Sequence, residues 1–175
     1  MADKIVFLDV DGILCHIGYD NPDTLDIAPD KVQKLAYICQ QTSAKVVIIS
    51  SWRGNEEYTP HIYHELRRIL QDAQIPVIGD APYIPAKILH YNPEKITTLE
   101  GIANLKIVYK TGRGAEVAKY IQDNNITHFV ILDDEDFKWS DYHLEQHWVH
   151  PTYYSKTHGG LQQHHVEQAI QILNT

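Results

Sequence analysis

The chain has 175 residues, of which 43% are hydrophobic and 22% are charged, close to the averages of soluble globular proteins. This composition excludes a disordered, collagen-like or low-complexity chain, and the length fits one domain of ordinary size. The net charge of −8 argues against a broad surface for duplex nucleic acid, which would need clustered Lys and Arg. A local basic pocket is still compatible with this charge.

The cysteine content and the N-terminus indicate a compartment. Cys15 and Cys39 are too few for a disulfide framework or for a zinc cluster built from thiolates. The N-terminus leads directly into the apolar residues 5–8, without a basic leader, a long apolar stretch or a small-residue cleavage site. We therefore expect a cytoplasmic protein that is neither exported nor inserted into a membrane.

Short apolar runs predict the strands. An unbroken run of this kind is typical of a strand buried on both faces of a parallel sheet. Such runs occupy residues 4–8, 46–49 and 129–132. Two shorter strands are expected at 76–78 and 148–149.

Apolar residues with a helical period lie between these runs. Pro29 and the pair Thr59-Pro60 each mark a helix start, since proline is favoured in the first turn and threonine as a cap. The period itself is carried by residues 32–39, 62–73, 117–121 and 166–173.

The alternation of strands and helices predicts the fold class. Right-handed crossovers would build a doubly wound, Rossmann-like α/β domain, with a parallel sheet of about five strands and helices on both faces. Residues 80–110 lack a clean period and are expected to form a small insertion or partial lid. We expect residues 1–175 to form a single domain that includes this insertion.

Polar residues follow three of the predicted strands, at the carboxyl ends that meet at one edge of such a sheet. They are Asp9 and Asp11, Ser50 and Ser51, and Asp133 and Asp134. Four carboxylates brought together repel one another unless a hard cation neutralises them, so Mg²⁺ is the expected cofactor.

The strand ends resemble the motifs of a known family. Residues 7–14, an apolar strand followed by Asp-x-Asp-Gly, are similar to the first motif of the haloacid dehalogenase-like (HAD) phosphohydrolases. Residues 45–50 resemble the second motif, a strand ending in Ser or Thr, and residues 130–134 resemble the fourth. The three motifs occur in the family's order.

A narrower resemblance involves other residues as well. They are similar to the phosphatase-like domain of Swiss Army Knife RNA-repair proteins, which is related to polynucleotide 3′-phosphatases. The residues that carry it are 50–53, Arg113-Gly114 with Glu116-Val117, 131–134 and Gly160-Leu161.

The resemblance implies a role for each acid. Asp9 would attack phosphorus and form an aspartyl-phosphate, and Asp11 would protonate the leaving oxygen and then activate water. Mg²⁺ would be held by Asp9, the backbone carbonyl of Asp11 and Asp134, with Asp133 orienting or sharing it. Ser50 would hydrogen-bond the phosphoryl group.

Several assignments stay open at this stage. The family's third motif supplies a Lys, where this chain offers Arg113 or Lys110; we favour Arg113 because its guanidinium can bridge two oxygens. Ser51 could replace Ser50, since a shift of one residue reverses the side that a residue faces. Trp52 and Arg53 could contact substrate, or Trp52 could belong to the core and Arg53 could tie a loop.

The function expected from these residues is Mg²⁺-dependent hydrolysis of a phosphomonoester through an aspartyl-phosphate. The substrate would be a small phosphorylated metabolite, a nucleotide or the 3′-phosphate end of a nucleic acid. A receiver-like signalling module that keeps its phosphate is the main alternative, and a catalytically silent interaction domain is the other. The receiver ranks lower because it places its acid pair and its acceptor Asp on different strands, whereas Asp9 and Asp11 share one.

Overall fold

The computed structural model describes residues 3–15, 26–54, 60–84, 112–152 and 159–175. Of the insertion expected at 80–110, only residues 80–84 belong to this part, and Lys110 lies outside it.

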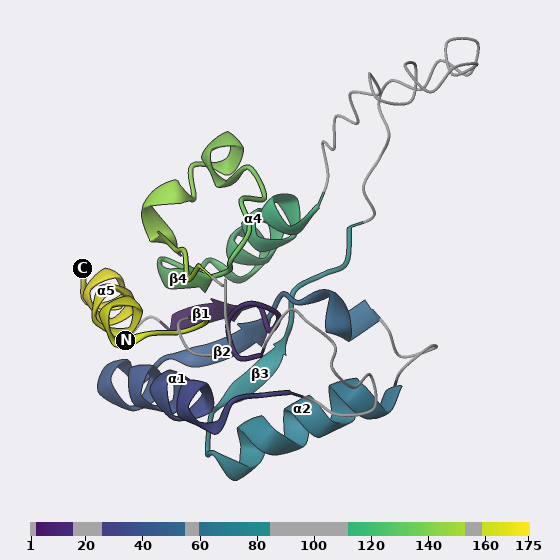
Figure 1. Cartoon of the computed structure of the whole chain (residues 1–175). Coiled ribbons are helices and arrows are strands. Elements are labelled where there is room, and N and C mark those ends of the chain that lie inside the picture. The colour runs from purple at the N-terminus through teal and green to yellow at the C-terminus, as the bar shows by residue number, and fades with distance from the viewer. Residues whose placement is uncertain (1–2, 16–25, 55–59, 85–111, 153–158) are drawn as a thin grey trace, which may run out of the picture.

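Five parallel strands form one sheet, as the sequence predicts (Figure 1). The strand order is β3-β2-β1-β4-β5, so β1 is central and pairs with β2 and β4. The strands are β1 (Lys4–Leu8), β2 (Lys45–Ile48), β3 (Val77–Asp80), β4 (His128–Leu132) and β5 (Trp148–Val149). This order and the helical crossovers make the domain a doubly wound, Rossmann-like α/β fold.

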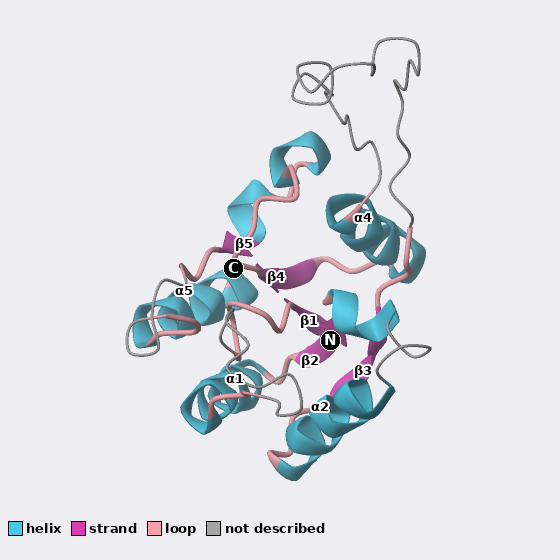
Figure 2. Cartoon of the chain, turned by 45° about the vertical axis from the view of Figure 1, so that its right-hand side comes forward, coloured by secondary structure: helices cyan, strands magenta, loops and turns pink. Residues whose placement is uncertain are grey.

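Helices cover both faces of the sheet. They are α1 (Pro29–Thr42), α2 (Pro60–Asp72), α4 (Arg113–Asn124) and α5 (Gln163–Asn174), with the short 3₁₀ turns η1 (Ser51–Gly54), η3 (Trp139–Tyr142) and η4 (Glu145–His147). Figures 1 and 2 show α1, α2 and α5 on one side of the sheet and α4 on the other. Among the helices in the described ranges, none has the length and apolar character needed to cross a membrane.

The side chains of the central strand divide between two cores, because successive residues of a strand point to opposite faces. Val6 and Leu8 join the core under α1, α2 and α5. Ile5 and Phe7 join a second core with α4 and η3. All four are fully buried, and each buried side chain of this size contributes about 1.5–3 kcal/mol to folding.

The strand predicted at 76–78 begins one residue later and extends to Asp80. Pro76 has no amide hydrogen to donate, although its carbonyl oxygen accepts a bond from the Val46 amide. Gly79 and Asp80 have low intrinsic strand propensity, and their place in β3 comes from pairing with Val47 and Ile48. The prediction was therefore wrong at both ends of this strand.

The register brings the polar residues to one edge of the sheet. Leu8 pairs with Ile48 on one side and with Leu132 on the other. The ladder continues one residue further, since the Asp9 amide donates to the Leu132 carbonyl at 2.9 Å. Asp9 and Asp133 therefore emerge side by side at the carboxyl ends of β1 and β4.

Candidate active site

Three carboxylates meet at the carboxyl edge of the sheet. Asp9, Asp133 and Asp134 each contribute an oxygen to a group whose members all lie within 4.8 Å of one another. Asp9 and Asp133 are buried, and Asp134 is partly exposed. The strand ends bring these acids together because β1 and β4 are adjacent and parallel.

Arg113, the first residue of α4, bridges two of these acids. Its Nη1 lies 2.8 Å from Asp9 Oδ2 and 2.7 Å from Asp133 Oδ2. The guanidinium carbon lies 4.3 Å from the centre of the Phe137 ring, and this cation–π contact stabilises the charged side chain. Burial lowers the pKa of Arg113, but the two carboxylates outweigh burial and raise it above its ordinary value, so the side chain stays charged.

One guanidinium does not balance three carboxylates. Burial raises the pKa of Asp133 to about 8, and the charge of Asp9 adds to this effect while Arg113 opposes it. Burial also raises the pKa of Asp134 to about 6, with Asp9 contributing again. For Asp9 itself, burial raises the pKa despite the attraction of Arg113. Among the described residues, the site therefore gathers more carboxylates than its single guanidinium can neutralise.

An unpaired atom shows where further positive charge would fit. Asp9 Oδ1 is buried and has no hydrogen-bond partner among the described residues. A buried carboxylate oxygen without a partner is costly, unless a ligand or ion completes its contacts. The three side chains of this cluster offer carboxylate oxygens, and oxygen ligands of this kind are the ones that Mg²⁺ prefers. The residues present therefore fit a hard divalent cation.

Gly12 makes room for this cluster. Its φ of +71° favours glycine, and a Cβ atom built on it would lie 2.1 Å from Asp134 Oδ2. The glycine after Asp11 thus permits both the tight turn and the close approach of Asp134.

The Asp11 side chain lies apart from the group of three. Its Oδ2 accepts a hydrogen bond from Trp52 Nε1 at 2.8 Å, and its Oδ1 accepts one from the Cys15 thiol at 3.3 Å. Asp11 belongs to the turn beyond β1 rather than to the strand, so its carboxylate is directed toward η1 and Cys15. Of the four carboxylates expected at the metal site, Asp9, Asp133 and Asp134 form the group within 4.8 Å. The contact of Asp11 with a metal, through its backbone carbonyl, stays a prediction.

Of the two serines after β2, Ser50 is fully buried and Ser51 is exposed. Ser50 Oγ accepts a bond from the Trp52 amide at 3.3 Å. Ser51 opens η1. The buried position at the strand end therefore belongs to Ser50, the residue favoured from the sequence.

Arg53 is tied to protein groups. Its Nη2 pairs with Glu116 Oε2, and its Nη1 donates to the Ser50 carbonyl at 2.9 Å. Both side chains of the ion pair are about 5% exposed. Glu116 Oε1 also accepts the Ile84 amide at 2.9 Å. These contacts support the loop-tying interpretation of Arg53. Its contact with substrate stays a prediction.

The sequence analysis did not identify Glu116 as the partner of Arg53, or Phe137 as a contact of Arg113. Glu116 appears in the narrower resemblance, but nothing local pairs it with a residue far away in the chain. A single acid among apolar helix positions is the signal that could have indicated a buried ion pair, since a buried acid requires a partner. Phe137 under Arg113 carried no such signal.

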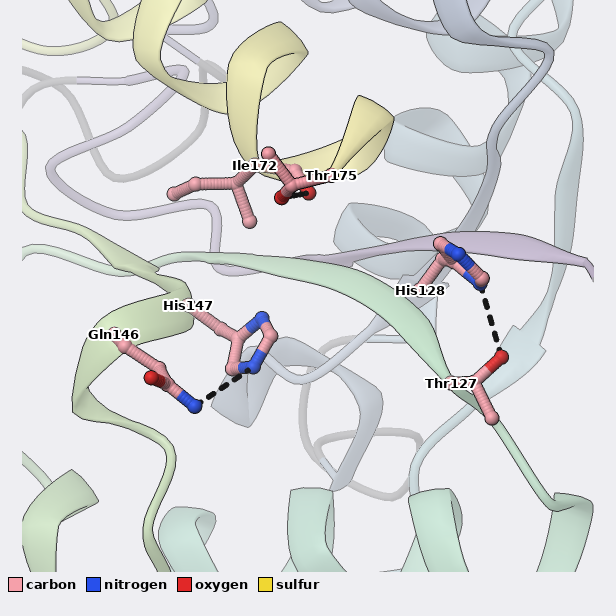
Figure 3. A pocket seen from close by; sticks show the side chains of 6 residues that line it. All are labelled: Thr127, His128, Gln146, His147, Ile172 and Thr175. Atoms are coloured by element: carbon pink, nitrogen blue, oxygen red, sulfur yellow. Dashed lines mark hydrogen bonds between the residues drawn. The ribbon is translucent and has the colours of Figure 1, made fainter.

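A pocket of about 330 Å³ lies away from the acids (Figure 3). His128 lies at the amino end of β4, so this pocket opens at the sheet end opposite to Asp133. The two imidazoles that line it bond to neighbours, His128 to Thr127 at 2.9 Å and His147 to Gln146 at 3.5 Å. It contributes no group to the acid cluster.

An all-parallel α/β sheet with clustered acids and a largely buried arginine at its carboxyl edge defines a Rossmann-like domain with an acidic site. The family model that describes the HAD domain in Swiss Army Knife RNA repair proteins matches residues 5–166. The chain therefore belongs to this family, and with it to the hydrolases of the HAD superfamily. Neither a curated protein nor a solved structure shows significant similarity to the chain.

Proposed function

We propose that the protein is a Mg²⁺-dependent phosphomonoester hydrolase that works through an aspartyl-phosphate on Asp9. The observation that carries this proposal is the environment of Asp9. Its Oδ2 is held by Arg113, and its Oδ1 is buried without a partner among the described residues. One oxygen is thus fixed, and the other is left for a cation or for phosphorus.

Three side chains would hold the metal. Asp9, Asp133 and Asp134 offer the clustered oxygens, and the backbone carbonyl of Asp11 would add a fourth ligand. When bound, Mg²⁺ supplies positive charge that draws electrons from the phosphoryl oxygens and screens them from the carboxylates.

The chain's own residues divide the reaction between them. Asp9 attacks phosphorus while Arg113 orients its carboxylate and favours its ionised form. Asp11 protonates the departing oxygen and, in the second half of the reaction, takes a proton from the attacking water. The hydroxyl of Ser50 would hydrogen-bond the phosphoryl group at the end of β2.

The substrate is a phosphomonoester. The family description refers to RNA repair and favours the 3′-phosphate end of a nucleic acid. The net charge of −8 favours a small contact over a broad duplex surface, so a nucleotide or small phosphorylated metabolite also belongs to this proposal. We place the reaction in the cytoplasm.

A receiver-like module would use the same kinds of groups and keep its phosphate. Asp11 favours the hydrolase, since it lies two residues beyond Asp9 and its hydrogen bonds hold it apart from the three clustered acids. A separate acid is what the second, hydrolytic half of the reaction needs. The buried Asp9 Oδ1, which has no partner among the described residues, argues against a silent interaction domain, because such a domain needs no ligand to complete its contacts.

The test is turnover of 4-nitrophenyl phosphate with Mg²⁺ and with a chelator, using the purified chain and its Asp9→Asn variant. We expect Mg²⁺-dependent release of phosphate by the wild type, and a loss of at least about a thousandfold in Asp9→Asn. Inactivity on a broad panel of phosphate esters, with identical behaviour of Asp9→Asn, would reject the proposal. A stable phosphoprotein that does not turn over and does not need Asp11 would favour the receiver.

A further inference from the structure

Trp52 makes a long-range contact to the proposed proton carrier. It belongs to η1, directly after β2, and its indole packs against the core on the α1, α2 and α5 side of the sheet. Its Nε1 donates to Asp11 Oδ2 at 2.8 Å across 41 positions of the sequence. Nothing in the Asp-x-Asp-Gly pattern requires this bond.

We propose that Trp52 is a positioning residue that holds Asp11 in place for its proton transfers, an inference that rests on the proposed phosphomonoester hydrolysis. An indole N–H is a donor only and has no acceptor function. Asp11 Oδ2 therefore remains an acceptor throughout the reaction. The proton that Asp11 delivers and recovers moves through Oδ1, whose contact in the structure is the weak donor Cys15 Sγ at 3.3 Å.

Asp11 needs such a partner because of where it lies. It sits in the turn beyond β1, is partly exposed, and has no ion pair with any of the described residues, unlike Asp9. Trp52 can supply a fixed donor, because its ring is packed and its own amide is bonded to Ser50 Oγ at 3.3 Å. The same short turn thus fixes the Ser50 hydroxyl and the Asp11 carboxylate.

The first half of the reaction shows where the loss of this bond would matter. An Asp9 oxygen forms a bond to phosphorus, the bond from phosphorus to the leaving oxygen breaks, and the proton of Asp11 moves to that oxygen. A weakly basic leaving group departs without this proton, whereas a strongly basic one needs it. Trp52 should therefore affect the two kinds of substrate differently.

The experiment compares Trp52→Phe with the wild type on 4-nitrophenyl phosphate and on phenyl phosphate, which have similar shapes but leaving groups of different basicity. We expect kcat/KM for phenyl phosphate to fall about tenfold with little change in KM, and kcat/KM for 4-nitrophenyl phosphate to fall less than about twofold. In an Asp11→Asn background, Trp52→Phe should cause no further loss, since Trp52 acts through Asp11.

A second measurement follows the contact without turnover. The chain has three tryptophans, and Trp52→Phe assigns the Trp52 indole N–H signal in a ¹⁵N spectrum. We expect Asp11→Asn to shift this signal far more than those of Trp139 and Trp148. If none of the three indole signals moves in Asp11→Asn, the inference is overturned, and this outcome needs no assignment from Trp52→Phe.

The outcomes separate the inference from the function it rests on. If Trp52→Phe lowers kcat/KM equally for both esters, and does so again in the Asp11→Asn background, Trp52 has a purely structural role. The hydrolase assignment would then still stand. A wild type inactive on both esters and on the broad panel of phosphate esters would contradict the hydrolase assignment and the role of Trp52 in it. The indole signal would still report whether the bond to Asp11 exists.

Discussion

The guanidinium of Arg53 and the carboxylate of Glu116 form a buried ion pair that joins the turn after β2 to α4. Arg53 also donates to the Ser50 carbonyl, and Glu116 accepts the Ile84 amide. Because α4 begins at Arg113, this pair sets the position of the helix that carries the bridging arginine relative to the strand end that carries Ser50.

We expect Glu116→Ala to lower the free energy of unfolding by about 3–5 kcal/mol, because it leaves the Arg53 charge buried without a partner. Denaturant unfolding measures this change. The exposed pair Lys119 and Asp123 on the same helix provides the matched comparison, and Asp123→Ala should cost less than about 1 kcal/mol.

The double variant Arg53→Met with Glu116→Leu separates the pair from its parts. Removing both charges should restore much of the stability that Glu116→Ala loses, since apolar groups of similar volume tolerate burial. A double variant that is as unstable as the sum of the two single variants would contradict this account of the pair.

Mg²⁺ should stabilise the folded chain through the acid cluster. At a concentration one hundred times its Kd, a ligand that binds only the folded state adds about 2.7 kcal/mol. We expect a rise in Tm with Mg²⁺ that a chelator reverses, and a much smaller rise in Asp134→Asn. Asp123→Asn, an exposed acid on α4, should respond like the wild type. An unchanged response of Asp134→Asn would remove Asp134 from the metal site.

Gly12→Ala should disable the site. The added Cβ would collide with Asp134 Oδ2, and the positive φ of Gly12 would be strained by about 1–3 kcal/mol besides. We expect loss of phosphatase turnover and of the Mg²⁺-induced rise in Tm. Gly79→Ala is the comparison, since its φ of +158° is also one that side chains rarely adopt, whereas no atom of the described residues lies within 4 Å of its added Cβ. Gly79→Ala should retain both properties, and retention of both by Gly12→Ala would refute the close approach.

His165 should make stability depend on pH. Burial lowers its pKa from 6.5 to about 4, and the charges of His164, His150 and Lys31 act in the same direction. The unfolded chain therefore binds a proton at His165 that the folded chain excludes. Its contribution to stability is complete above pH 6.5 and is lost as the pH falls from there toward about 4.

The measurement is the difference in unfolding free energy between the wild type and His165→Gln from pH 7 to pH 4. Gln keeps a side-chain acceptor for the Gln162 amide, which His165 Nδ1 accepts at 3.1 Å. The variant should lose less stability than the wild type over this range. If the unfolding free energies of the wild type and of His165→Gln change in parallel with pH, the pKa of His165 does not differ between the folded and unfolded chain, and the prediction is wrong.

The sequence by itself determined the strands, the helices and the set of acids, because these depend on local patterns. Unbroken apolar runs mark buried parallel strands, and the carboxyl ends of such strands share an edge, so Asp9 and Asp133 could be predicted to meet. The end of β3 could not be predicted, because Gly79 and Asp80 become strand only through pairing with β2.

The tertiary structure alone decided which side chains touch. Arg113 reaches both Asp9 and Asp133 with one nitrogen, and this depends on where α4 docks on the sheet. The neighbours Trp52 and Arg53 reach different elements, one bonding to Asp11 and the other to Glu116. The spacing of residues along a helix or strand sets the face from which each side chain projects. The partner of a long side chain, however, depends on how elements that are far apart in the sequence pack against one another.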